Sequence, residues 1–67
     1  MNILQELEDN RPHIINTYEV ELDGSTEQEV ELHFQELFPD KVVVVMELCN
    51  LPDVVEVTIM EQDLNNN

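Results

Sequence analysis

Carboxylates recur at every second position of one short segment of this chain. Glu19, Glu21 and Asp23 alternate with the apolar side chains of Val20 and Leu22. In an extended strand, residues two apart project from the same face and lie about 6.6 Å apart, because the rise is roughly 3.3 Å per residue. Phosphates of a DNA strand advance about 3.4 Å along the axis and also wind around it, so their through-space separation is roughly twice as long. This spacing favours electrostatic recognition, in which a row of carboxylates presents charge as a row of phosphates does.

The charge balance of the whole chain supports this interpretation. Of 67 residues, 16 are Asp or Glu and only two, Arg11 and Lys41, are Lys or Arg, which gives a formal net charge of -14. Self-repulsion of this size opposes a compact fold, yet 42% of the residues are hydrophobic and they follow strand and helix periods. We therefore expect a small folded body that binds a strongly positive partner. Nucleic acids and anionic membranes would repel it, so we expect neither as a direct ligand.

Further acidic side chains are expected to extend this negative surface. Glu47 and Glu56 lie in two later strand-like segments and would lengthen the row on neighbouring strands. Glu29, Glu36 and Asp40 follow one another at i, i+7 and i+11, along one side of a helix. The predicted partner-binding residues are Glu19, Glu21, Asp23, Glu29, Glu36, Glu47 and Glu56.

Residue types that carry catalysis or bind metals form no persuasive constellation in this sequence. Ser25 and Thr26 are better explained as helix caps, and Cys49 has no histidine near it in the sequence to activate it. With sixteen acids, some carboxylate pair has almost any spacing, so such a pair does not indicate a glycosidase. The calcium-loop pattern D-x-[DN]-x-[DN]-G is absent, and the acidic cluster at 6–9 would attract divalent ions only weakly. We predict no enzyme activity, no metal site and no cofactor.

The first two elements follow from a change in apolar spacing. Ile3, Leu4 and Leu7 lie at i, i+1 and i+4, which predicts a short N-terminal helix. That helix should end before Pro12, because the residue preceding a proline is disfavoured in helical geometry. Alternation over 13–23 then predicts a strand with one apolar and one acidic face.

A helix is expected after the glycine that ends this strand. Ser25 with Gln28, or Thr26 with Glu29, fits a capping box at its start. The spacing i, i+4, i+7 and i+8 predicts a buried helix face, formed by Val30, Phe34, Leu37 and Phe38. Pro39 ends the helix.

Two more strands complete the predicted fold. The segment 42–48 is rich in valine, 49–53 is a loop, and 54–61 is a third strand. The predicted fold is α+β: a short N-terminal helix, then β-α-β-β, with one helix packed on a three-stranded mixed sheet. The strands flanking the helix would be parallel through a right-handed crossover, and the last two would form a hairpin. We expect one domain over 1–62 and a flexible tail over 63–67.

The sheet face away from the helix is expected to combine acidic side chains with an apolar strip. The predicted apolar residues of this strip are Val43, Val45, Val54 and Met60. A contiguous apolar strip is rarely left bare on a soluble protein. Either the N-terminal helix or a second copy of the chain would cover it, so a homodimer is a possible assembly.

The size, the charge and the acidic strand from Thr17 to Asp23 resemble those of small, very acidic proteins that bacteriophages make to disable host nucleic-acid-binding proteins. Many proteins of that class imitate DNA, and their targets include restriction enzymes, CRISPR effectors, uracil glycosylase, RNA polymerase and histone-like proteins. The resemblance covers the whole chain in size and charge. It implies an inhibitor in the host cytoplasm that occludes the DNA-binding surface of a basic host protein.

Two other functions fit the same sequence. An adaptor or regulatory protein would bind its partner through the apolar strip or through Leu32, with the acids serving solubility. An antitoxin-like protein would neutralise a basic partner without competing with DNA. The N-terminus lacks the basic start and long apolar run of a secretion signal, and no stretch approaches 18 apolar residues. We therefore expect a cytoplasmic setting.

Overall fold

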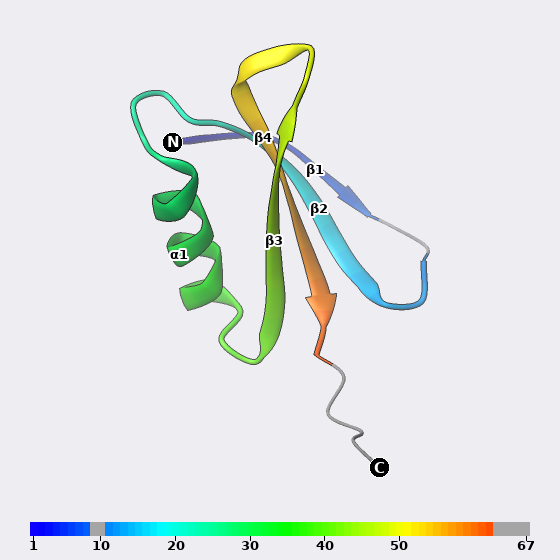
Figure 1. Ribbon diagram of the computed structural model, residues 1–67. Helices are drawn as coiled ribbons and strands as arrows, with labels where there is room; N and C mark the ends of the chain where they lie inside the picture. Colours follow the sequence, from blue (N-terminus) through cyan, green and yellow to red (C-terminus); the bar gives the residue numbers. More distant parts are fainter. Residues whose placement is uncertain (9–10, 63–67) are drawn as a thin grey trace.

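The computed structural model describes residues 1–8 and 11–62, and within them four strands form one antiparallel sheet with a helix against one face (Figure 1). The elements are β1 (Asn2–Glu8), β2 (Ile14–Glu21), α1 (Glu27–Leu37), β3 (Lys41–Leu48) and β4 (Leu51–Glu61). The strand order is β1-β2-β4-β3, and every neighbouring pair is antiparallel. The edges of the sheet are therefore β1 and β3. The predicted tail over 63–67 lies outside the described residues.

The prediction of an N-terminal helix is wrong, because this segment is strand β1. It pairs with β2 from Asn2 opposite Glu21 to Glu8 opposite Asn16. A helix of two turns is marginal in water because its first turn is costly to form. As a strand, the same segment satisfies the backbone hydrogen bonds of β2, which would otherwise be left at the edge of the sheet.

The predicted three-stranded mixed sheet with β-α-β-β order is also wrong. β4 lies between β2 and β3, so these two run in the same direction without pairing. The predicted hairpin between the last two strands is present as β3 and β4. β4 takes a central position and supplies three strand residues that are each at most 1% exposed, Val55, Val57 and Ile59.

Helix α1 begins at a capping box, and the structure selects Thr26 over Ser25 as its cap. The backbone N–H of Glu29 donates to Thr26 Oγ1 (3.1 Å), and the Thr26 N–H donates to Glu29 Oε1 (2.8 Å). Val30 and Phe34 are buried, and the Phe34 ring lies 5.0 Å from that of Tyr18 on β2.

One residue of the predicted helix face is exposed. Leu37 is 56% exposed, whereas Phe34 is buried and Phe38 is half-buried. Three residues turn a helix by about 300°, so Leu37 lies about 60° around the axis from Phe34. The buried face is centred on Phe34, and Leu37 falls at its margin.

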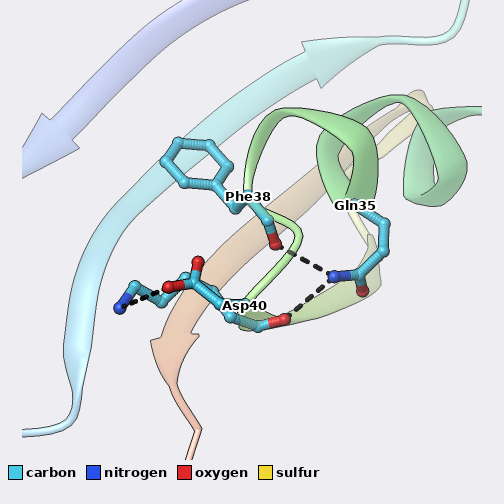
Figure 2. Close-up of polar contacts among 4 residues, drawn as sticks. Gln35, Phe38 and Asp40 are labelled. Carbon is cyan, nitrogen blue, oxygen red and sulfur yellow. Dashed lines mark hydrogen bonds and ion pairs between the residues drawn. The ribbon is translucent and has the colours of Figure 1, made fainter.

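The C-terminal end of α1 is stabilised by the amide side chain of Gln35, and its last turn contains no basic residue. Gln35 Nε2 donates to the carbonyl oxygens of Phe38 (3.0 Å) and Lys41 (2.9 Å), as Figure 2 shows. Asp40 and Lys41 form an ion pair of 3.8 Å in the same turn. Gln35 thus satisfies the Phe38 carbonyl at the end of α1 and, through the Lys41 carbonyl, ties the helix to the start of β3.

The core lies between α1 and one face of the sheet; we call the other face the open face. The buried apolar residues of the core are Val20, Val30, Phe34, Val43, Val55, Val57 and Ile59. The predicted orientation of β3 is therefore corrected. Val43 lies opposite Ile59 and Val45 opposite Val57, so both point toward the helix and not to the open face. Within the described residues, no helix has the length and apolar composition needed to cross a membrane.

Candidate partner-binding surface

The open face gathers three of the predicted carboxylates on the two central strands. Glu19 on β2 lies directly opposite Glu56 on β4. Glu21 follows Glu19 by two residues and therefore projects from the same face. We call Glu19, Glu21 and Glu56 the acidic patch.

The residues of the acidic patch have no basic neighbour in the row that Glu19 and Glu56 form across the sheet. Residues directly opposite in an antiparallel sheet have Cβ atoms about 4.5–5.5 Å apart, and like charges at this distance destabilise the sheet. The row continues to Gln5 on β1 and Met46 on β3, both uncharged. Asn2 Nδ2 donates to Glu21 Oε1 (3.1 Å) and helps to orient that carboxylate. The patch is thus an ordered array of negative charge.

An apolar strip borders the acidic patch on the open face. It consists of Val42, Val44 and Met46 on the outer side of β3, which are 39%, 36% and 54% exposed. These three residues were not predicted for the strip, because five apolar residues in a row leave open which alternate set faces the helix. Of the residues predicted for this strip, Val54 and Met60 do lie on the open face, where both are half-buried. β1 extends the sheet at its other edge instead of covering the strip.

Two threonines occupy the centre of the open face, next to the acidic patch. Thr17 and Thr58 lie opposite each other, between Leu7 on β1 and Val44 on β3. They are 6% and 9% exposed. Thr17 Oγ1 is buried and has no hydrogen-bond partner among the described residues.

The other predicted contact residues lie away from the acidic patch. Asp23 has a φ of 49° in the turn after β2, before Gly24 at 89°, and Ser25 N donates to the Leu22 oxygen across this turn (2.9 Å). The Asp23 N–H donates to Asp53 Oδ2 (3.3 Å). Asp23 therefore has a structural role in the connection from β2 to α1.

The carboxylates predicted to form a row along the helix do not act together. Glu29 has a structural role, and Glu36 is exposed. Glu29 belongs to the capping box, so its carboxylate is engaged by the backbone. Glu36 is exposed on α1, which lies on the opposite side of the sheet from the acidic patch. These carboxylates cannot act as one surface with Glu19 and Glu56.

Glu47 is the fourth predicted contact residue that lies away from the acidic patch, and its carboxylate is next to that of Glu27, which was not among the predicted residues. Glu47 lies on the helix side of β3, opposite Val55, where its side chain hydrogen-bonds with Glu27 at the start of α1. Sharing a proton with Glu47 raises the pKa of Glu27 above its usual 4.5, and partial burial and the Glu47 charge raise it further. Only the packing of α1 on β3 brings these two residues together, so sequence spacing carried no signal for the pair.

In residues 1–8 and 11–62, no group of three or more His, Cys, Asp or Glu residues is placed to hold a metal ion. Cys49 is a free, exposed thiol in the turn between β3 and β4. Comparisons of this chain with protein-family models, curated protein sequences and solved structures found no match.

Proposed function

We propose that this protein is an acidic inhibitor that imitates nucleic acid and occupies the nucleic-acid-binding surface of a basic host protein. The observation that supports the proposal is the acidic patch, in which Glu19 and Glu56 lie opposite each other and Glu21 lies two residues along. Opposed carboxylates weaken a sheet. Because the opposed carboxylates do not stabilise the fold, binding to a basic partner explains why they are present.

The mechanism is competitive occlusion. Lys and Arg side chains that normally contact phosphates pair with the acidic patch instead, and DNA is excluded while the inhibitor stays bound. The net charge of -14 steers the encounter with a basic surface, which raises the association rate. Salt screens both surfaces, so affinity falls as ionic strength rises. The proposal places the protein in the host cytoplasm, where a histone-like protein, RNA polymerase, or a restriction or CRISPR nuclease meets DNA.

A mobility-shift experiment tests this proposal. A histone-like protein is bound to a labelled DNA duplex at low salt, and the acidic protein is titrated in. We expect release of free DNA, and a pull-down from host lysate eluted with a salt gradient extends the test to the other target classes. The double variant Glu19→Lys with Glu21→Lys should lose this activity while keeping its circular dichroism spectrum.

The matched control changes the same charge elsewhere. Glu36→Lys with Asp40→Lys alters two exposed carboxylates at the C-terminal end of α1 and should still release DNA. If the patch variant releases DNA as well as the unaltered protein, the patch is not the contact surface. If both variants fail equally, total charge matters and the arrangement of carboxylates does not.

The exposure of Val42, Val44 and Met46 favours a second candidate function, an adaptor that binds its partner through the apolar strip. An adaptor would leave DNA bound, so a ternary complex of DNA, target and this protein would favour it. A second copy of the chain covering the strip stays a prediction. Sedimentation equilibrium at high micromolar concentration tests it, and a monomer there would exclude it.

A further inference from the structure

The two edge strands of the sheet differ in how well they are protected. β1 carries Glu6 and Glu8 and has a register shift between Ile3 and Gln5. Charges and irregularities of this kind are the usual means of preventing another strand from pairing with an edge. In β3, residues 42–46 contain no charge and no proline, and the register shifts only at Glu47. β3 therefore offers a regular, uncharged backbone edge to an added strand.

A groove runs beside this unprotected edge, between β3 and α1. Its volume is about 540 Å³, and the residues that line it are Glu27, Gln28, Glu31, Val43, Val44 and Val45. The helix thus forms one wall and contributes two carboxylates, while the strand forms the other wall. Glu47 lies beside Glu27 at one end of this wall.

The geometry of strand pairing determines what kind of segment fits. Side chains alternate between the two faces of an added strand. One set would point to the helix side and meet Glu27 and Glu31. The other set would point to the open face, beside Val42 and Val44. The groove is therefore complementary to an extended segment in which basic and apolar residues alternate.

We propose that the groove between α1 and β3 binds an extended basic segment of a partner protein, which adds to the edge of β3 as a fifth strand. Backbone hydrogen bonds to β3 supply sequence-independent affinity, and the carboxylates of α1 select basic side chains. The acidic patch is on β2 and β4, on the other face of the sheet, so the two surfaces can be tested separately.

Charge argues against a second copy of this chain as the occupant. Pairing of two β3 edges would bring two sets of Glu27 and Glu31 to one seam. Each chain also carries a net charge of -14. A basic segment removes this repulsion, whereas a second copy doubles it.

The first experiment uses synthetic hexapeptides of alternating lysine and valine, acetylated and amidated, titrated into the ¹⁵N-labelled full chain. We expect the amide signals of Val43, Val44 and Val45 to shift, and hydrogen exchange to slow at those of these amides that point away from β4. A peptide with glutamate in place of lysine should not bind. Two further peptides carry N-methyl groups, one on every lysine and the other on every valine. In an extended strand all the lysine N–H groups point to one edge, so one N-methylated peptide should bind and the other should not.

Variants of the chain complete the test. Glu27→Gln with Glu31→Gln should weaken peptide binding by roughly fivefold, as expected for two exposed ion pairs. Glu19→Gln with Glu56→Gln, the matched pair on the open face, should leave it unchanged. Equal binding of both N-methylated peptides would rule out strand addition. Loss of binding only in the Glu19 and Glu56 variant would move the site to the open face, and protection of β3 amides in a dimer without peptide would identify a second copy as the occupant.

Discussion

Glu19 of β2 lies directly opposite Glu56 of β4, and both carboxylates project from the open face of the two central strands. Their neighbours in the same row, Gln5 and Met46, carry no charge that would offset the repulsion. This pair is a local cost to folding in a domain whose small core leaves little stability to spare.

Removing one charge of this pair should stabilise the protein and weaken its proposed activity. Glu56→Gln is expected to raise the free energy of unfolding by about 0.5 kcal/mol, because a repulsive cross-strand pair becomes neutral. Urea denaturation measures this change. Glu61→Gln is the matched control, since Glu61 lies opposite Lys41 and the substitution removes an attractive neighbour instead. An equal gain in both variants would show that total charge, and not the Glu19–Glu56 contact, sets the stability.

Thr17 should be replaceable by valine with a gain in stability. Its hydroxyl is buried without a hydrogen-bond partner among the described residues, and leaving such a group unsatisfied costs about 1–3 kcal/mol. Thr17→Val keeps the side-chain shape and is expected to raise the free energy of unfolding by about 1 kcal/mol. Thr58→Val, on the facing residue, should give a smaller gain. A loss of stability in Thr17→Val would contradict this expectation.

The carboxyl pair of Glu27 and Glu47 should make stability depend on pH. The raised pKa of Glu27 means that the folded state keeps this proton at pH values where the unfolded chain has lost it. Stability therefore falls as the pH rises above 4.5 through the raised pKa. Glu27→Gln removes this loss, so its melting temperature should exceed that of the unaltered protein at neutral pH.

The same difference should shrink as the pH falls through and below 4.5, because Glu27 then becomes protonated in the unfolded chain as well. Thermal melts of both proteins across this range measure it. Glu36→Gln serves as the control for removing one exposed helix charge. A difference that stays constant with pH would show that Glu27 does not share a proton with Glu47.

The capping box of α1 should contribute measurably to folding. Thr26→Ala removes the acceptor of the Glu29 N–H and is expected to destabilise the protein by about 1 kcal/mol. In a domain of this size that change lowers the melting temperature by about 4–8 °C. Ser25→Ala, at the alternative cap suggested by the sequence, should cost less, because the structure gives the capping role to Thr26. An equal loss in both variants would be inconsistent with this assignment.

The sequence by itself determined the local elements wherever one period was strong. The helix was predictable because Val30 and Phe34 follow its period and Thr26 with Glu29 caps its start. The alternation through Glu19 and Glu21 likewise indicated a strand with one acidic face. These features depend on residues a few positions apart, so local geometry is enough to specify them.

Only the tertiary structure decided how these elements combine. The spacing of Ile3, Leu4 and Leu7 suits a helical turn, yet this segment forms a strand because it pairs with the edge of β2. Five consecutive apolar residues on β3 leave open which alternate residues face the helix. Pairing of Val43 with Ile59 and of Val45 with Val57 decides this. The pairing of Glu19 with Glu56, and of Glu27 with Glu47, depends on register and on helix packing between segments far apart in the chain. Alternation sorts the side chains of one strand into two faces, but only the neighbouring strands and the helix determine which face is buried and which charges meet.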